Sequence, residues 1–220
     1  METLRKKSAR ALTLIEVLIV VAVVAILAVL LLPYTTYNGH ASSSARRMVC
    51  ANNLLQVDLG FRLWAQDNSD KFPMQVSTTN GGSMESAAAG DVAPVFQVVS
   101  NELKTPKILV CPADSRQFAA TFSSRDFSAS NVSYFVNRDA SVDYPQMFLS
   151  GDRKLTTNGV PVNSGILVLT TNQVIGWTQE IHQGRGNIAF TDGHVQSLSN
   201  SALNRALQDI GSPTNRLVIP

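Results

Sequence analysis

The sequence has few charges, few cysteines and few histidines. Charged side chains make up 15% of the 220 residues, well below the roughly 25% of an average soluble domain. Two cysteines cannot build a disulfide scaffold or a four-cysteine zinc site, and they allow one bridge at most. Three histidines and the absence of HExxH, GxSxG and CxxC motifs leave little for a histidine-based active site. We therefore expect no catalytic residue and no enzymatic activity.

Positive charge is concentrated at the amino terminus. Residues 1–11 hold four basic side chains against Glu2, a charge of +3, so the other 209 residues sum to −1 when the whole chain carries +2. Proteins that bind nucleic acid need a basic face that neutralises phosphates. Most of this chain lacks such an excess, and we expect no nucleic-acid partner.

An apolar run follows the basic segment. Residues 12–32 contain only Thr13 and Glu16 as polar interruptions. A helix of this length, at about 1.5 Å per residue, spans roughly 31 Å, which matches the hydrocarbon core of a bilayer. We expect residues 12–33 to cross a membrane once, with the basic amino terminus on the cytoplasmic side. A cleaved secretory signal fits less well because its apolar region is only about 7–15 residues long, and an uncleaved signal anchor is the simpler alternative.

Glu16 is the one charge in this run. A carboxylate within a membrane helix costs about 2.5–3.5 kcal/mol or more, and such residues usually have a functional reason. Glu16 is therefore a candidate functional residue. The alternative is an acid that is simply tolerated near the membrane surface.

Residues 11–17, Ala-Leu-Thr-Leu-Ile-Glu-Val, together with the basic leader resemble the processing signal of type IV prepilins and type II secretion pseudopilins. The resemblance implies that prepilin peptidase removes residues 1–11 by cutting between Ala11 and Leu12, and then methylates the new amino terminus. The family usually has Gly and Phe where this chain has Ala11 and Leu12.

Two further positions fit the same family. After the cut, Glu16 is the fifth residue, where the family has a glutamate, and Pro33 is the twenty-second, where many members have a helix-kinking proline. The resemblance implies that Glu16 meets the Leu12 amine of a neighbouring subunit and sets the register of assembly. Pro33 lacks a backbone donor, which predicts a kink or break there and a loosened connector over residues 34–39.

Helical periodicity resumes near Ala41 and continues to about residue 66. One apolar stripe should face the protein's own core: Cys50, Leu54, Val57, Phe61 and Trp64. A second stripe lies on roughly the opposite side: Met48, Leu55, Leu59 and Leu63. A second apolar face needs a second partner, and the helix of a neighbouring subunit fits better than more of the same core.

The rest of the chain predicts a small β-rich region with little helix. We expect a loop at 77–90, a short helix or turn at 92–103, strands at 108–111 and 133–136, two strands within 165–176, a hairpin at 187–198 with a two-residue turn at Asp192-Gly193, and a helix at 201–210. The expected fold is α+β and pilin-like: a long amino-terminal transmembrane helix packs its second half on a small antiparallel sheet, and residues 34–220 form the globular domain.

A second motif lies near the carboxy terminus. His182 is followed after nine residues by Asp192 and Gly193. Together with upstream segments, this spacing resembles a large subgroup of prepilin-like proteins; those segments are Cys111–Asp114, Ser133–Asn137 and Gly151–Arg153. We expect a structural role for the motif. A zinc site of His182, Asp192 and His194 is less favoured, because Asp192 sits at the tip of a turn.

Calcium has a slightly better case than zinc, since some of the major pseudopilins that the chain resembles hold it in a carboxy-terminal loop. The available oxygen ligands are Asp126, Asp139, Asp143 and Asp152. No dense acidic loop contains them, and we expect no metal and no other cofactor.

The two cysteines allow two arrangements. Cys50 falls on the core-facing stripe, and Cys111 ends an expected strand. Beyond the membrane the compartment is oxidising, which favours a disulfide that pins the helix to the sheet. Two buried free thiols are the alternative.

The resemblance as a whole implies a structural subunit of a type II secretion pseudopilus or a type IV pilus-like filament. Its partners would be other pilin or pseudopilin subunits, prepilin peptidase and the inner-membrane assembly platform. Before assembly, it would cross the inner membrane once, with a periplasmic globular domain. Two alternatives stay open: a membrane-anchored periplasmic ligand-binding protein or enzyme that does not polymerise, and a minor or tip pilin that binds a ligand or DNA.

Overall fold

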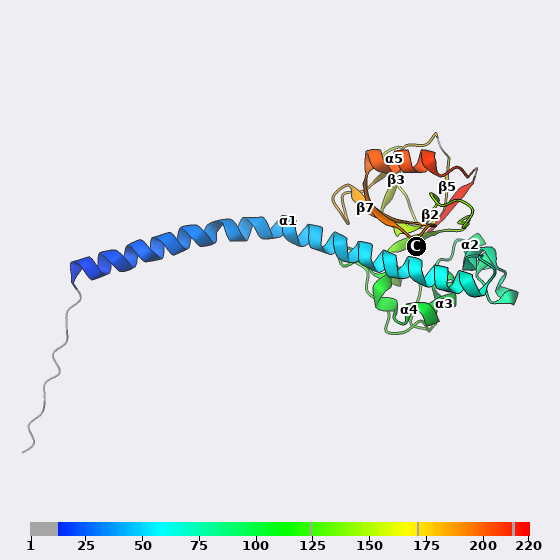
Figure 1. Ribbon diagram of the computed structural model, residues 1–220, viewed down its shortest axis with the longest axis horizontal. Helices are drawn as coiled ribbons and strands as arrows, with labels where there is room; N and C mark the ends of the chain where they lie inside the picture. The colour runs from blue at the N-terminus through cyan, green and yellow to red at the C-terminus, as the bar shows by residue number, and fades with distance from the viewer. Residues whose placement is uncertain (1–12, 124, 171, 213) are drawn as a thin grey trace, which may run out of the picture. The chain divides into compact units, whose positions relative to one another are not determined.

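The computed structural model describes residues 13–220 apart from residues 124, 171 and 213, and it describes the backbone but not the side chains of residues 29–42 (Figure 1). The chain divides into two units, Met1–Ser42 and Ser43–Pro220. The predicted leader, with Ala11 and Leu12 at the predicted cut, lies outside the described residues.

The first long element is the helix α1 (Leu14–Asp67). A capping box holds its first turn: the Thr13 N–H and hydroxyl both donate to Glu16 Oε2 over 2.9 Å, and the Glu16 N–H donates to Thr13 Oγ1 over 3.4 Å. The backbone is helical at Pro33 and over residues 34–39, so the predicted break and loosened connector are wrong. A proline removes one backbone hydrogen bond from a helix. In α1 the helix continues on both sides of Pro33, so this loss does not end it.

In the part of the chain that the structure describes, no helix has an apolar stretch long enough to cross a membrane. The predicted span, residues 12–33, reaches outside that part at both ends, at Leu12 and at the side chains of residues 29–33.

Two apolar stripes of α1 have opposite environments in the globular unit. The core stripe, defined as Cys50, Leu54, Val57, Phe61 and Trp64, is buried, and its most exposed member, Trp64, is 9% exposed. The outer stripe, defined as Met48, Leu55, Leu59 and Leu63, is 42–63% exposed. The predicted burial of the first stripe is confirmed, and the described residues of the chain leave the second one uncovered.

Short helices fill the stretch between α1 and the first strand. They are η1 (Pro73–Gln75), η2 (Thr78–Asn80), α2 (Met84–Ala88), α3 (Ala93–Val98), α4 (Ser100–Leu103), η3 (Pro106–Leu109) and η4 (Ala129–Asn131). The predicted helix or turn at 92–103 is confirmed as α3 and α4.

Two predictions for this stretch are wrong. Residues 77–90 contain η2 and α2, because Glu85 accepts hydrogen bonds from the Ser77 hydroxyl over 2.6 Å and the Thr78 N–H over 2.8 Å and so holds the segment together. Residues 108–111 are not a strand. Pro106 stands in the first turn of η3, and the Thr105 hydroxyl caps that turn, two features that start a helix.

The remaining elements form two antiparallel sheets and one helix. The larger sheet has the order β5-β9-β1-β2-β7-β8, with β1 (Tyr134–Asn137), β2 (Phe148–Asp152), β5 (Gly165–Leu169), β7 (Arg185–Phe190), β8 (Val195–Ser199) and β9 (Asn215–Ile219). The smaller sheet has the order β4-β3-β6, with β3 (Leu155–Thr157), β4 (Val160–Pro161) and β6 (Ile175–Trp177), and the helix is α5 (Asn200–Asp209). The chain is α+β with antiparallel sheets, which is consistent with a pilin-like fold.

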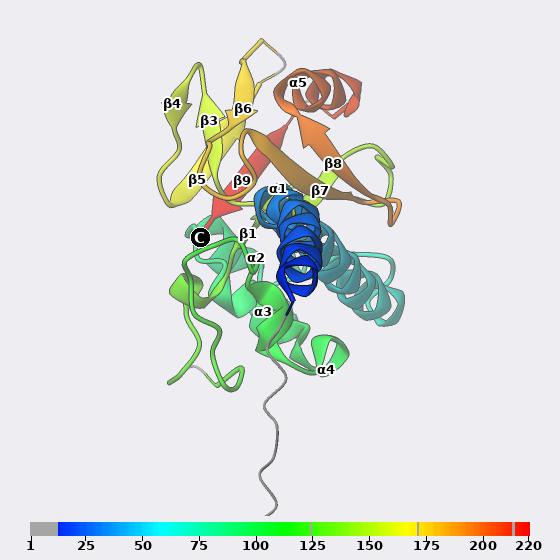
Figure 2. The same ribbon diagram turned by 90° about the vertical axis from the view of Figure 1, so that its left-hand side faces the viewer.

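Both faces of the larger sheet are covered. Successive side chains of a strand point to opposite faces: Tyr134 and Val136 of β1 join the apolar cluster that contains the core stripe, whereas Phe135 joins the cluster that contains Leu203 and Leu207 of α5. Figures 1 and 2 show the globular unit with α1 on one side of the sheet and α5 on the other. The predicted packing of the helix's second half across a sheet is therefore confirmed.

In the carboxy-terminal part, the predicted strands lie near the expected positions, but several have other pairing partners than expected. The two strands expected within 165–176 are β5 and β6, but β5 pairs with β9 and β6 pairs with β3, so they belong to different sheets. The hairpin of β7 and β8 is confirmed, while its predicted two-residue turn is wrong. The Phe190 N–H donates to His194 O over 3.0 Å, which leaves a three-residue loop closed by Gly193 at φ 100°.

Candidate functional site

A disulfide lies in the core of the globular unit. Cys50 of α1 and Cys111, which follows η3, are bonded, with Cα atoms 5.1 Å apart, and both residues are fully buried. The two cysteines are 61 residues apart in the sequence, and the chain-entropy model gives a loop of that size roughly 4 kcal/mol of stabilisation. Of the two arrangements that the sequence left open, the structure has the bridge.

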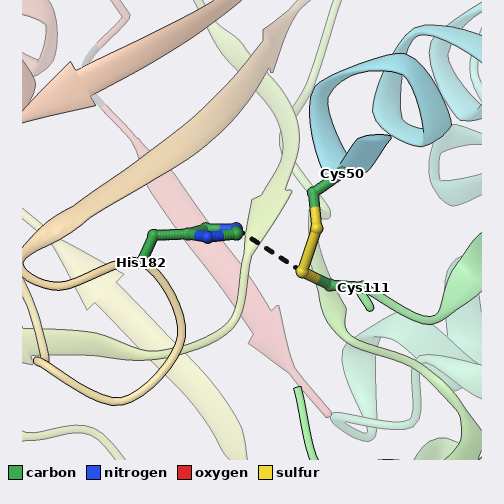
Figure 3. Close-up of side chains that lie close together, drawn as sticks. All are labelled: Cys50, Cys111 and His182. Atoms are coloured by element: carbon green, nitrogen blue, oxygen red, sulfur yellow. Dashed lines mark hydrogen bonds between the residues drawn. A yellow bond between two sulfur atoms is a disulfide. The ribbon is translucent and has the colours of Figure 1, made fainter. Parts of the chain in front are cut away.

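His182 points its ring at this disulfide (Figure 3). Its Nε2 lies 3.4 Å from Cys111 Sγ and 3.5 Å from Asp152 Oδ2. The His182 side chain is fully buried, and its Nδ1 has no hydrogen-bond partner among the described residues. We name the residues Cys50, Cys111, His182 and Asp152 the buried cluster.

Asp152 stands at the end of β2. Its Oδ2 accepts two hydrogen bonds from Asn187 of β7, one from the backbone N–H over 2.7 Å and one from Nδ2 over 3.0 Å. Within the described part of the chain, Asp152 Oδ1 has no partner, like His182 Nδ1. The buried cluster therefore holds polar atoms that the surrounding protein does not satisfy, at a cost of about 1–3 kcal/mol each.

Burial favours the neutral form of both ionisable members of the cluster. It raises the pKa of Asp152 to about 7, against the hydrogen bonds from Asn187, which lower it. It lowers the pKa of His182 to about 4, and the nearby charge of Arg47 acts in the same direction. The 3.5 Å contact between the two side chains is thus a contact between groups that resist charging rather than a full ion pair.

Motifs that are far apart in the sequence converge at this place. The Asp114 N–H donates to Cys111 O over 2.8 Å, and the Asp114 carboxylate accepts hydrogen bonds of 2.8 and 2.9 Å from Arg153. The Arg153 N–H donates in turn to Ser133 O over 3.1 Å. These bonds link the three upstream segments of the carboxy-terminal motif around the buried cluster.

Asp192 and Gly193 belong to the turn between β7 and β8, where Asp192 is exposed, whereas His182 is buried. The His194 N–H donates to Asp192 Oδ1 over 3.1 Å, and the His194 ring stacks on Phe190 with centroids 4.2 Å apart. A Cβ on Gly193 would stand 3.4 Å from the guanidinium of Arg62, whose Nη1 donates to Thr191 O over 2.8 Å. The turn is thus fastened to α1, and in the described residues His182, Asp192 and His194 form no common group of metal ligands.

The four aspartates considered for calcium make separate contacts. Asp126 accepts a hydrogen bond from Thr121, Asp139 pairs with Arg216, Asp143 accepts from Ser141 and Asp152 accepts from Asn187. Over the described residues, no group of three converging metal ligands includes them.

Sequence reasoning did not identify Asn187 as the partner of Asp152, nor Asp152 as the partner of His182. Asn187 was placed only as the first residue of a predicted strand. The one signal that could have identified Asn187 is its amide side chain next to the apolar residues 188–190, because a buried amide needs a hydrogen-bond partner.

Residues 6–32 match the model of the prokaryotic N-terminal methylation motif. This match supports a prepilin- or pseudopilin-type protein. A motif of this type implies processing by prepilin peptidase and, in general, assembly with other pilins. It also suggests a membrane-anchored amino terminus. No curated protein and no solved structure matches the chain.

The environment of Asp152 predicts a specific dependence of stability on pH. The native state keeps a proton on Asp152 up to about pH 7, whereas the unfolded chain loses it near pH 4, so this group destabilises the native state as pH rises between those values. The variant Asp152→Asn should therefore gain unfolding free energy relative to the original protein over that range, by up to about 4 kcal/mol.

Denaturant unfolding at a series of pH values, followed by tryptophan fluorescence, measures this difference. Both proteins keep His182, whose lowered pKa acts in the opposite direction, so the difference isolates Asp152. Asp209→Asn, which removes a carboxylate from an exposed residue, is measured alongside as the control. A constant offset between Asp152→Asn and the original protein would contradict the assignment.

Proposed function

We propose that this protein is a structural, non-enzymatic subunit of a type II secretion pseudopilus or a type IV pilus-like filament. The match of residues 6–32 to the N-terminal methylation motif carries the proposal. The α+β unit with antiparallel sheets is compatible with it. The oxidised subunit needs no cofactor for this role. Its partners are other pilin or pseudopilin subunits, prepilin peptidase and the assembly platform of the inner membrane.

Before assembly, the apolar residues 12–33 hold the subunit in the inner membrane, and residues 34–220 lie in the periplasm. The apolar run and the basic leader in the sequence support this topology. An oxidising compartment also accounts for the disulfide between Cys50 and Cys111.

In the filament, the outer stripe packs against the helix of a neighbouring subunit. Its four apolar side chains recur along one face of α1 at helical spacing and are 42–63% exposed. A contiguous apolar face of this kind on a folded unit marks an interaction surface. Burying such side chains between subunits stabilises association by about 25 cal/mol per Å² of apolar area.

Glu16 has two possible tasks. In the described chain it belongs to the capping box with Thr13. In the assembled filament we propose that its charge meets the Leu12 amine of a neighbouring subunit and fixes the register. The two tasks need different chemical groups, since a neutral amide can still accept the capping hydrogen bond but cannot pair with an ammonium.

The first test is the intact mass and amino-terminal sequence of the protein from its native membrane. We expect a chain that starts at Leu12 and carries one added methyl group. A chain that still starts at Met1 would mean a static membrane anchor that does not polymerise.

Glu16→Gln and Thr13→Ala separate the two tasks of Glu16. We expect Glu16→Gln to lose filament assembly, because the charge is gone, and Thr13→Ala to keep it, because only a cap worth about 1 kcal/mol is lost. Sheared filaments and membrane-bound subunit, both quantified by immunoblot, provide the readout. Equal loss in the two variants would reduce Glu16 to a helix cap.

The outer stripe is tested by Leu59→Asp, which places a charge at a position that is 55% exposed. We expect the unfolding free energy to change by no more than about 0.5 kcal/mol and filament assembly to be abolished. Val174→Asp is the matched control, since Val174 is similarly exposed, at 62%, but lies outside α1. Normal filaments from Leu59→Asp would exclude the outer stripe as the packing surface.

A further inference from the structure

The buried cluster supports an inference that does not depend on the filament role. The Sγ atoms of Cys50 and Cys111 and a ring nitrogen of His182 all lie within 4.8 Å of one another, and the three residues are buried. Figure 3 shows the histidine ring directed at the two sulfurs. The ligands come from α1, from the segment after η3 and from the segment between β6 and β7, so only the folded unit brings them together.

The spacing of the donor atoms fits a particular kind of ion. In a tetrahedral zinc site the metal lies about 2.3 Å from sulfur and about 2.0–2.2 Å from nitrogen or oxygen, which places neighbouring ligand atoms roughly 3.3–3.8 Å apart. His182 Nε2 is 3.4 Å from Cys111 Sγ and 3.5 Å from Asp152 Oδ2. The distance between His182 and Cys111 that such a site requires is therefore present in the oxidised protein, with Asp152 beside it.

We propose that reduction of the disulfide converts the buried cluster into a Zn²⁺ site. The thiolates of Cys50 and Cys111 and Nε2 of His182 bind the ion, and Asp152 lies beside the site. Formation of the disulfide expels the ion, so the cluster exists either as a disulfide or as a metal site.

The unsatisfied polar atoms of the cluster support this assignment. In the described structure Asp152 Oδ1 and His182 Nδ1 are buried without a partner. A proton on His182 Nδ1 leaves Nε2 free to bind the metal. Two thiolates balance the charge of Zn²⁺, so the ion itself adds no net charge to the core.

The conversion balances in electrons and protons. A phosphine gives two electrons to the disulfide and takes an oxygen atom from water, and the S–S bond is replaced by two S–H groups. Binding of Zn²⁺ then releases both thiol protons. A small disulfide oxidant reverses the change: it accepts two electrons and two protons, becomes two thiols, and the Cys50–Cys111 bond forms again as the ion leaves.

The test titrates Co²⁺, a spectroscopic substitute for Zn²⁺, into the full chain in detergent after reduction by a phosphine. We expect one Co²⁺ per chain, with sulfur-to-cobalt charge-transfer absorption that Zn²⁺ removes by competition, and no such absorption in the oxidised protein. His182→Gln should weaken binding by more than about 100-fold, since even a change to a partner of a ligand costs about 10–100-fold. The matched control His194→Gln should bind as the original protein does.

Absence of thiolate absorption in the reduced protein, or equal affinity of His182→Gln, would overturn the proposal. A second measurement needs no variant: Zn²⁺ should slow the alkylation of Cys50 and Cys111 in the reduced protein by more than about 10-fold, and equal rates with and without Zn²⁺ would also overturn it. Neither result bears on the amino-terminal mass, so failure here is distinguishable from failure of the filament role.

Discussion

The contact between the core stripe of α1 and the larger sheet is the interaction on which the globular unit depends. The stripe shares one apolar cluster with side chains from four central strands: Val136, Leu149, Ala189 and Val218. Because the other face of that sheet is covered by α5 and the smaller sheet, the central strands are buried on both sides. A helix that serves as one wall of a core can use its opposite side for other contacts, and here that side carries the outer stripe.

The core that α1 closes also contains a polar interior. Gly151 shows how tightly this interior is built: a Cβ there would lie 2.6 Å from Ile188 and 2.8 Å from the ring of Phe135. Because Gly151 has no side chain, Ile188 and Phe135 pack over β2 at this point, and the adjacent Asp152 lies beside His182. Apolar packing therefore positions the buried cluster, while the disulfide fastens the helix across it.

Periodicity along the chain predicted the second half of α1, from about residue 41 to 66, both of its stripes and α5, because helical spacing is a local property that burial leaves visible. It also predicted β1 and the hairpin of β7 and β8. It failed where local chemistry competes with an apolar run, as at Ile108, where a proline and a threonine cap start η3. It missed β2, β3, β4 and β9. These strands are short or mix polar with apolar residues, and they owe their strand conformation to partners that are distant in the sequence.

In the candidate site too, local motifs could be predicted from the sequence and contacts between distant residues could not. The motif with His182 was visible, and so were both cysteines, but nothing in their spacing reveals that His182 meets Cys111, 71 positions away. Asp192 and Gly193 are close to His182 in the motif but belong to a turn with another task. Contacts between side chains that are remote in sequence depend on strand order, which a single sequence does not encode in any local pattern.

The place of β9 in the sheet has a consequence for the order of folding. β9 lies between β1 and β5, so it joins the sheet from residues 215–219, after every other strand has been synthesised. Until then β5 has no neighbour in the larger sheet, and Val218 is missing from the cluster that covers the core stripe. The larger sheet therefore closes only when these residues are available, rather than progressively from the amino terminus. During that interval the core stripe lacks part of its apolar cover, while the outer stripe is as exposed as in the finished unit.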